Sequence, residues 1–209
     1  MPRRGRVIDF YDRHAEEFAR RYEAIPFERA HGRIINWLPD SPGIVLDVGA
    51  GSGRDAAWFA AYGHKVFAVE PATGLRKLAA ALHPSPNIHW IDSRLPELAS
   101  LSPIAQGVDL VWVSPVWMHL APEERRPSFC TLIQRTRPGG RMIISLRHGE
   151  FSDGREAHSV SVAEIEVMAA EQGIDLVAVV RSDDAAGRLN LAWEHVVLLK
   201  PSCVERSVF

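Results

Sequence analysis

The sequence has few cysteines, no long apolar run and little net charge, and each absence excludes a class of protein. Cys130 and Cys203 are the only cysteines in 209 residues. Two are too few for the disulfide framework of a small secreted domain, so we expect both to be reduced. The richest apolar run, 110–120, is far shorter than the ~20 residues of a membrane-spanning helix. With 24 Lys plus Arg against 26 Asp plus Glu, a net charge of −2 gives no overall preference for nucleic acid.

Targeting signals, repeats and metal-binding patterns are also missing. The basic segment 1–6 leads into acidic residues rather than an apolar stretch, so we expect no secretory signal and a cytoplasmic protein. No His, Cys or carboxylate residues have the spacing of metal ligands, so we expect no metal. The composition, 46% hydrophobic and 24% charged, is that of an ordinary globular domain with enough apolar residues for a full core.

Short β-branched apolar runs alternate with longer helical patterns, which predicts a parallel sheet covered by helices. The expected strands are 44–48, 65–69, 87–91, 108–113, 141–146, 175–181 and 193–199. The expected helices are 9–22, 27–37, 55–62, 73–82, 122–136 and 162–172. No helix separates the last two strands, so we expect an antiparallel pair at one edge of the sheet. Pro138-Gly139-Gly140 predicts a turn before the fifth strand, and Ser161, Glu164 and Gly173 fit the caps of the last helix.

The strongest motif is Asp47-Val48-Gly49-Ala50-Gly51-Ser52-Gly53, between a predicted strand and a predicted helix. Its alternate glycines allow a sharp turn and a close approach to a ligand. A dinucleotide fingerprint expects Gly or Ala at the next position, where Arg54 stands. Glu70 ends the second strand and can accept from both hydroxyls of a ribose, and Asp92 ends the third and suits the adenine amine. A turn, a ribose clamp and an adenine clamp without a pyrophosphate pocket indicate S-adenosylmethionine.

With these motifs the sequence resembles the class I S-adenosylmethionine-dependent methyltransferases. It is most similar to the small-molecule branch with a helical N-terminal lid, of the methyltransferase-domain 11 and 25 type. The matching segments fall in family order within about 11–200, and they are 45–53, 69–71, Asp92 with Leu95-Pro96, 109–111 and 137–140. The resemblance implies an α/β fold with a Rossmann-like seven-stranded sheet of order 3-2-1-4-5-7-6, the last strand antiparallel, and helices on both faces. It also implies a single domain over 1–209, with a helical lid over 1–42, a core over 43–200 and a tail over 201–209.

The resemblance further implies roles for residues around the cofactor. Asp47 would orient the glycine loop and meet the amino group of the cofactor through backbone or water. Glu70 would bind the ribose hydroxyls, Asp92 the adenine amine, and Tyr11 would close the lid over the cofactor. The other residues expected at the cofactor are Arg20 or Arg21 at its carboxylate, Gly49, Ala50, Gly51, Gly53, Pro71, Ser93, Arg94 and Ser114.

The segments after the fourth and fifth strands lie where open α/β sheets bind ligands, so we expect the methyl acceptor there. His119 and His148 are the candidate bases and candidate substrate contacts. His119 could equally pack against the edge of the cofactor. Trp117 is expected as a pocket wall and Tyr22 as part of an aromatic lining.

Arginines in the same region indicate an anionic group on the acceptor. Arg147 follows the fifth strand and suits a carboxylate or phosphate. The alternative is a loop salt bridge from Arg147 to Glu150 or Asp153. Arg155 and Arg188 are further candidates, although we expect most of these arginines to be solvated.

Together these features predict the transfer of a methyl group from S-adenosylmethionine to a small-molecule acceptor of aromatic or anionic character, leaving S-adenosylhomocysteine. Transfer is an in-line displacement in which positioning dominates. A catalytically inactive cofactor-binding protein remains an alternative. An NAD-dependent oxidoreductase is disfavoured by Arg54 and by the antiparallel C-terminal pair. A nucleic-acid methyltransferase is disfavoured by the charge and by Ser114-Pro115-Val116-Trp117, where an Asn/Asp-Pro-Pro-Tyr/Phe motif would stand. We expect no membrane association, and either a monomer or a homodimer.

Overall fold

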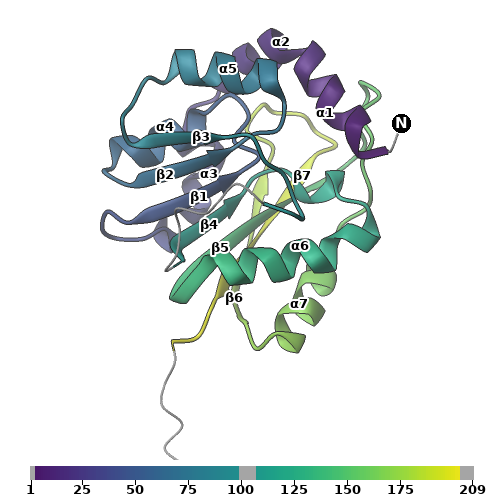
Figure 1. Ribbon diagram of the computed structural model, residues 1–209. Helices are drawn as coiled ribbons and strands as arrows, with labels where there is room; N and C mark the ends of the chain where they lie inside the picture. Colours follow the sequence, from purple (N-terminus) through teal and green to yellow (C-terminus); the bar gives the residue numbers. More distant parts are fainter. Residues whose placement is uncertain (1–2, 99–106, 203–209) are drawn as a thin grey trace, which may run out of the picture.

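A computed structural model describes residues 3–98 and 107–202, and within them the strands form a seven-stranded sheet (Figure 1). Its order is β3-β2-β1-β4-β5-β7-β6. Strand β7 runs antiparallel to both β5 and β6, and the other neighbours are parallel. The strand order and the antiparallel edge pair expected from the sequence are therefore confirmed. The strands are β1 (Ile44–Val48), β2 (Lys65–Val69), β3 (Ile88–Ile91), β4 (Val108–Val113), β5 (Thr136–His148), β6 (Asp175–Asp183) and β7 (Ala192–Leu199).

Helices cover both faces of the sheet. The α-helices are α1 (Arg3–Arg13), α2 (Ala15–Glu23), α3 (Phe27–His31), α4 (Arg54–Ala61), α5 (Thr73–Leu82), α6 (Pro122–Arg135) and α7 (Val162–Glu171), and the 3-10 helices are η1 (Gly32–Trp37) and η2 (Trp117–His119). One core cluster joins the sheet to α6 and α7, and a second joins its other face to α3, η1 and α4. Helices α1 and α2 pack against α5 through a third cluster. In Figure 1 these three helices lie together at one end of the molecule.

The central strands are apolar because both of their faces are buried. In β1, Val45 belongs to the core on the α4 side, and its neighbours Leu46 and Val48 belong to the core on the α6 side. Asp47 is the exception in this strand, and it is almost fully buried. A buried acid in an otherwise apolar strand, immediately before a glycine turn, indicates a functional position.

The two N-terminal helical predictions were too simple. The helix expected over 9–22 is interrupted at His14, whose backbone leaves the helical region at φ −111° and ψ 23°. Asp12, just before the break, accepts a hydrogen bond from the backbone N–H of Gly74 at the start of α5. The helix expected over 27–37 becomes the short α3 and then the tighter η1 from Gly32, where glycine and the β-branched pair Ile34-Ile35 lower the α-helical propensity.

The turn expected at Pro138-Gly139-Gly140 lies within β5, which begins at Thr136. Its pairing with β4 shifts register between Val108 and Leu110, where Gly139 adopts φ +73°. A Cβ on Gly140 would lie 2.8 Å from the Val108 carbonyl oxygen, so only glycine allows β5 to resume its pairing there.

The capping box expected for α7 forms only in part. Ser161 Oγ accepts from the backbone N–H of Glu164 at 3.2 Å. The carboxylate of Glu164 instead accepts from Arg125 at 2.7 Å. Gly173 follows the helix with φ +64°, as expected of a C-terminal glycine.

Trp117 lies in the core and is not a pocket wall, which corrects the expectation from the sequence. Its side chain is 0% exposed and belongs to the cluster between the sheet and α6. Its indole Nε1 has no hydrogen-bond partner among the described residues. The position of the Trp117 side chain is therefore set by the packing of η2 in the core and not by contact with a ligand.

We expect Trp117→Ala to lower the free energy of unfolding by about 3–5 kcal/mol, because it empties a large buried volume. Trp117→Phe should cost much less, because it keeps most of the ring and removes an unsatisfied donor. Chemical denaturation of both variants measures this. Equal losses in the two variants would contradict a packing role.

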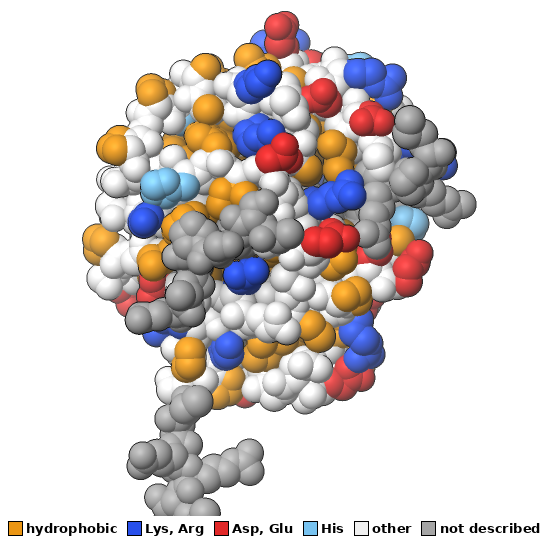
Figure 2. Space-filling model, viewed as in Figure 1, with side chains coloured by type: hydrophobic (Ala, Val, Ile, Leu, Met, Phe, Trp, Pro, Cys, Tyr) orange, Lys and Arg blue, Asp and Glu red, His pale blue; other side chains and the backbone are white. Residues whose placement is uncertain are grey.

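Several other features of the described residues bear on function. No helix there is long and apolar enough to cross a membrane. No group of three or more His, Cys, Asp or Glu side chains in that part of the chain is arranged to hold a metal ion. Cys130 is a free, partly exposed thiol, and Cys203 lies outside the described residues. Figure 2 shows basic and acidic side chains interspersed on the face in view.

Candidate active site

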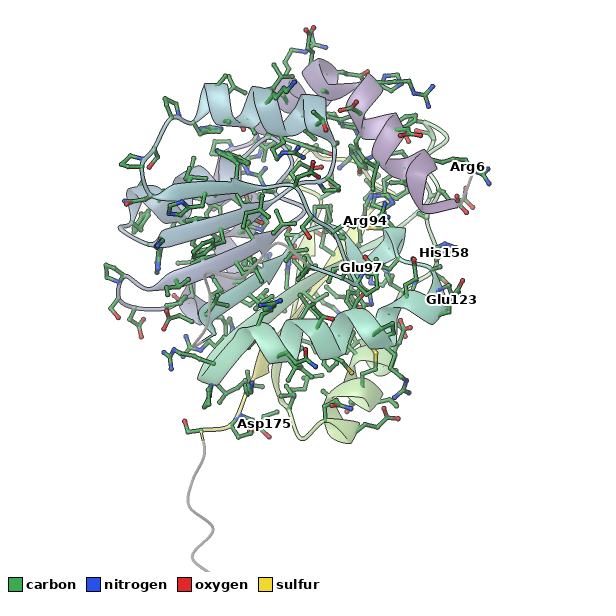
Figure 3. All side chains as sticks on the ribbon, viewed as in Figure 1. Arg6, Arg94, Glu97, Glu123, His158 and Asp175 are labelled. Carbon is green, nitrogen blue, oxygen red and sulfur yellow. The ribbon has the colours of Figure 1, made fainter. Side chains whose placement is uncertain are left out.

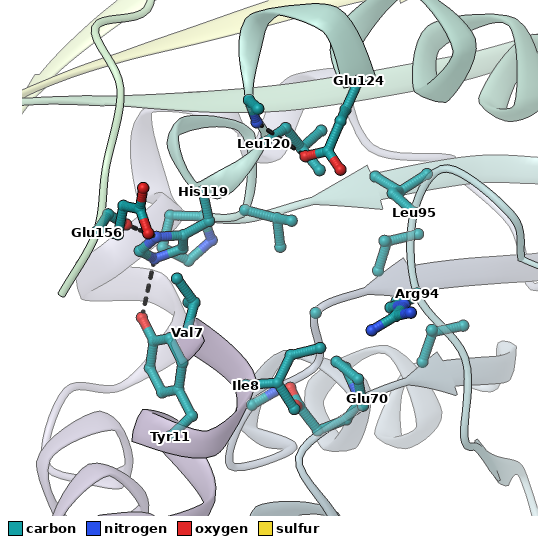
Figure 4. A pocket seen from close by; sticks show the side chains of 18 of the residues that line it. Val7, Ile8, Tyr11, Glu70, Arg94, Leu95, His119, Leu120, Glu124 and Glu156 are labelled. Atoms are coloured by element: carbon teal, nitrogen blue, oxygen red, sulfur yellow. Dashed lines mark hydrogen bonds between the residues drawn. The ribbon is translucent and has the colours of Figure 1, made fainter. Parts of the chain in front are cut away.

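A large cleft of about 660 Å³ opens at the carboxyl ends of β1, β2 and β4 and is bordered by α1 (Figure 4). This is the ligand edge of an open α/β sheet. In Figure 3, Arg94, Glu123 and His158 lie along the side between α1 and α6. The residues that line this large cleft include Val7, Ile8, Tyr11, Tyr22, Gly49, Gly51, Glu70, Pro71, Ser93, Arg94, Leu95, Pro115, Val116, His119, Glu123, Glu156 and His158.

A small cavity of about 310 Å³ adjoins the large cleft. Both are lined by Tyr11, Tyr22, Pro115 and His119, which therefore form the boundary between them. The small cavity takes its other walls from the N-terminal helices, the start of α4, the segment after β4, β5 and the loop after it, and the β6–β7 hairpin. These walls include Arg21, Ile25, His31, Arg54, Ser114, Arg147, Phe151, Arg155, Asp183, Asp184, Arg188, Trp193 and His195.

The glycine turn at the end of β1 needs its glycines. Gly49, Gly51 and Gly53 have φ of +74°, +58° and +86°, in the left-handed region that favours glycine. A Cβ on Gly49 would lie only 2.2 Å from Val116 Cγ2. The Gly49 N–H donates to the Val69 carbonyl at 2.8 Å and holds the turn against the end of β2.

Glu70 is bound to this turn. Its Oε2 accepts from the Gly51 N–H at 2.9 Å, and its Oε1 accepts from the Ala72 N–H at 2.8 Å. A phosphate bound at such a turn would accept a hydrogen bond from the Gly51 N–H. Here that N–H already donates to the carboxylate of Glu70. A pyrophosphate would also meet the charge of Glu70, whereas hydroxyl donors can bind its remaining lone pairs. Glu70 therefore occupies one backbone donor of the turn and can still accept from hydroxyl groups.

Burial raises the pKa of Glu70 to about 7, although the N–H groups of Ala72 and Gly51 stabilise its charge. A hydroxyl donates to the ionised carboxylate, so binding of a ribose should favour loss of this proton. We expect the affinity for S-adenosylhomocysteine to rise about tenfold between pH 6 and pH 8, as linkage to one group of this pKa requires. Calorimetric titration at both pH values measures the change. An affinity that falls or stays constant over this range would contradict the ribose contact, and Glu70→Gln should remove the dependence.

Asp47 supplies a buried acceptor beneath the turn. Its Oδ2 has no hydrogen-bond partner among the described residues. Burial raises the pKa of Asp47 well above its usual range, and the nearby charges of Asp55 and Glu70 raise it further. An unsatisfied buried oxygen of this kind fits a ligand that brings a donor, directly or through a water molecule.

Arg54 anchors the N-terminal helices to the core, a role that sequence reasoning missed. It pairs with Asp55 at 2.7 Å and donates to the Tyr22 and Ile25 carbonyls at 3.4 and 3.3 Å. His31 contacts the same Asp55 at 3.0 Å. Burial opposes ionisation of Asp55, but Arg54 and His31 hold its pKa below the ordinary value. The residue that breaks the dinucleotide fingerprint thus joins α4 to the segment after α2.

His119 is fixed as a hydrogen-bond acceptor at the boundary between the two cavities (Figure 4). Its Nδ1 lies 2.8 Å from the Glu156 carbonyl oxygen, which can only accept, so Nδ1 carries the proton. Its Nε2 then accepts from the Tyr11 hydroxyl at 3.1 Å, and that hydroxyl accepts from Arg155 at 2.7 Å. Burial, together with the charges of Arg155 and Arg147, lowers the pKa of His119 to about 4. His119 is therefore neutral at pH 7.

Two of the three expected arginines pair with carboxylates. Arg155 was expected to be solvated, but its side chain is only 6% exposed and pairs with Asp153 at 2.8 Å. Arg188 pairs with Asp184 at 2.7 Å, and that carboxylate also accepts from Trp193 Nε1. These pairs fix the walls of the small cavity.

Arg147 has no such partner. It donates to the backbone carbonyls of Gly149 and Glu150 at 2.6 and 3.1 Å. No carboxylate among the described residues pairs with it, so the loop salt bridge considered from the sequence is absent within this part of the chain. Its Cζ lies 3.6 Å from the centre of the Phe151 ring.

Comparison with known proteins agrees with this architecture. A family model described as a methyltransferase domain matches residues 46–144. The chain carries a methyltransferase domain. The match spans the glycine turn, Glu70, and the strands from β1 to β5. A search of curated proteins gave no significant match.

Solved structures share the fold of this chain over most of its length. The 1,6-didemethyltoxoflavin-N1-methyltransferase of Burkholderia thailandensis, solved with 1,6-didemethyltoxoflavin and S-adenosylhomocysteine, is 17% identical with a TM-score of 0.72, over 94% of this chain and 88% of that chain. A TehB-like S-adenosylmethionine-dependent methyltransferase from Corynebacterium glutamicum is 21% identical with a TM-score of 0.66, over 90% and 98%. The magnesium protoporphyrin IX methyltransferase of Synechocystis, solved with S-adenosylmethionine, is 17% identical with a TM-score of 0.59, over 77% and 71%. At these identities the likeness shows the fold alone.

The fold brings many of the expected cofactor residues to one cleft. Those that line the large cleft are Tyr11, Gly49, Gly51, Glu70, Pro71, Ser93 and Arg94. Ser114 instead lines the small cavity. Asp47, Ala50 and Gly53 belong to the β1 strand and turn and line neither cavity.

Three expected site residues lie elsewhere. Arg20 is exposed on α2 and lines neither cavity, whereas Arg21 lines the small one. The Asp92 side chain is 66% exposed and pairs with Arg76 at 2.8 Å. His148 lines neither cavity and contacts Glu194 at 3.0 Å, so the geometry favours His119 of the two candidate bases.

Proposed function

We propose that this chain binds S-adenosylmethionine in the large cleft and transfers its methyl group to a small molecule held in the small cavity. The observation that carries the proposal is the pairing of two adjoining cavities, the larger of which contains a glycine turn clamped by a buried carboxylate. The family match over residues 46–144 supports the reaction class. The cavity sizes support a small acceptor, because both lie within the range of small-molecule sites.

The cofactor supplies a sulfonium methyl group that is already activated for transfer. In this proposal Glu70 accepts from the ribose hydroxyls, and Asp47 receives the amino group through water. Ser93 and Arg94 lie beside the adenine ring of the cofactor. Helix α1 acts as a lid that places Tyr11 over the cleft. The product is S-adenosylhomocysteine, as in the ligand set of the Burkholderia enzyme.

At the boundary of the cavities the protein aligns the acceptor and excludes water. Tyr11 donates to His119 Nε2 and is held from its other side by Arg155, so the phenol is fixed where the methyl group would pass. The low pKa of His119 makes it an acceptor that orients Tyr11 rather than a strong base. We propose that positioning supplies most of the acceleration, as expected for displacement at an activated carbon.

Methyl-labelled S-adenosylmethionine, incubated with the protein and, in separate reactions, with a fractionated extract of small molecules or with total nucleic acid, tests the proposal. We expect a labelled product and an equal amount of S-adenosylhomocysteine, both absent with boiled protein. Transfer of label to nucleic acid alone would contradict a small-molecule acceptor. Binding of the cofactor without transfer from any fraction would favour a cofactor-binding regulatory protein.

A further inference from the structure

The small cavity contains one buried arginine that pairs with no carboxylate among the described residues. Five arginines line it: Arg21, Arg54, Arg147, Arg155 and Arg188. Three of them pair with carboxylates, namely those of Asp55, Asp153 and Asp184. Arg21 is exposed to solvent, which screens its charge. The remaining cation is Arg147.

The Arg147 guanidinium retains unused donors. It has five N–H groups, and the described residues accept from it at only two carbonyls, those of Gly149 and Glu150. Its side chain is 8% exposed, so it is held away from bulk water. The charges of Arg188 and Arg155 add to the effect of burial and lower its pKa, which means that an anion beside it would be stabilising.

Part of the remaining lining of the small cavity is apolar and aromatic. Tyr22, Ile25 and Trp193 line the cavity. The Phe151 ring separates the two polar ends, because its centre lies 3.6 Å from Arg147 Cζ and 5.4 Å from the centre of the His119 ring. A molecule about one or two rings long would therefore reach from Arg147 to the boundary with the large cleft.

We infer that the methyl acceptor is a small, ring-containing monoanion whose acid group binds Arg147. Its ring lies among Tyr22, Ile25 and Trp193, and the atom to be methylated faces Tyr11 and His119. A dianion such as a phosphate ester is disfavoured, because Arg54, Arg155 and Arg188 already pair with carboxylates. This inference rests on the proposed function, and it assigns Arg147 as the residue that selects acids over neutral analogues.

Binding of benzoate and of its neutral analogue benzamide tests the inference. The dissociation constants are measured by calorimetry with the protein saturated with S-adenosylhomocysteine. We expect benzoate to bind at least about tenfold more tightly than benzamide, as a hydrogen bond to a charged group allows. Arg147→Gln should remove this preference, and Arg147→Lys should keep part of it because the charge remains.

Arg181→Gln is the matched control. Arg181 is 83% exposed on β6 and lies outside the cavity, so its replacement should leave the preference unchanged. Thermal unfolding of each variant shows whether it is folded. The inference is overturned if neither compound binds at millimolar concentration, if the preference survives in folded Arg147→Gln, or if phenyl phosphate binds more tightly than benzoate.

Separate results would contradict the proposed function and the assignment of the acceptor. S-adenosylhomocysteine that does not bind would contradict the proposed function. If benzoate nevertheless binds to the protein in a way that depends on Arg147, the anion site at Arg147 is still supported. S-adenosylhomocysteine that binds normally, without an Arg147-dependent preference for acids, would contradict only the assignment of the acceptor.

Discussion

Glu70→Gln is expected to weaken the binding of S-adenosylhomocysteine at pH 8, where Glu70 is ionised, by about 100-fold, the equivalent of about 3 kcal/mol for two lost hydrogen bonds to a charged group. In the native protein both oxygens of Glu70 accept from backbone N–H groups of the glycine turn and of Ala72. The amide of glutamine turns one acceptor into a donor, which then faces another N–H. The ribose hydroxyls also lose a charged acceptor. Calorimetric titration measures the affinity.

Glu123→Gln is the control for this loss. Glu123 also lines the large cleft, but at its far side near α6, away from the glycine turn (Figure 3). Its replacement removes a similar charge from the same cleft, so an effect of charge alone would appear in both variants. If Glu70→Gln binds as tightly as the native protein, the ribose assignment is wrong.

Gly49→Ala is expected to abolish cofactor binding and to lower the free energy of unfolding by about 2–4 kcal/mol, combining left-handed backbone strain with overpacking. The new Cβ would lie 2.2 Å from Val116 Cγ2, and φ at this residue is +74°. The turn would have to move away from the end of β2, where Gly49 is hydrogen-bonded to Val69. Denaturation and calorimetry measure the two effects.

Two further variants separate strain from crowding. Gly49→Ala with Val116→Ala removes the clash but not the strain, so it should recover only part of the lost stability. Gly32→Ala should be neutral or stabilising, because φ there is −55° and no atom lies within 4 Å of the new Cβ. Equal behaviour of Gly49→Ala and Gly32→Ala would show that the turn does not need glycine at position 49.

Local sequence patterns predicted the parts of the fold that local physics controls. Strands 44–48 and 108–113 match the structure at both ends, because burial on both faces makes them continuous apolar runs. Helix 73–82 also matches. The break at His14 could not be predicted, because it accompanies the contact of Asp12 with Gly74, far along the chain.

The candidate site likewise has parts that the sequence predicts and parts that it does not. The glycine turn and Glu70 are close in sequence and could be found from their spacing. The small cavity could not, because its walls come from distant segments, and the contact between Arg155 and Tyr11 spans 144 positions. Arg155 carried no signal that it would be buried, and Trp117 carried none that it would pack in the core. Conversely, Arg54 gave a signal as a departure from a known fingerprint, but only the fold shows that it anchors the N-terminal helices.

The most direct test of the central claim is a calorimetric titration of the native protein with S-adenosylhomocysteine and, separately, with NAD at pH 8. Glu70 occupies the N–H that a pyrophosphate would need and offers lone pairs to ribose hydroxyls. The account predicts saturable binding of one S-adenosylhomocysteine per chain and no measurable binding of NAD. Tight binding of NAD without binding of S-adenosylhomocysteine would contradict it.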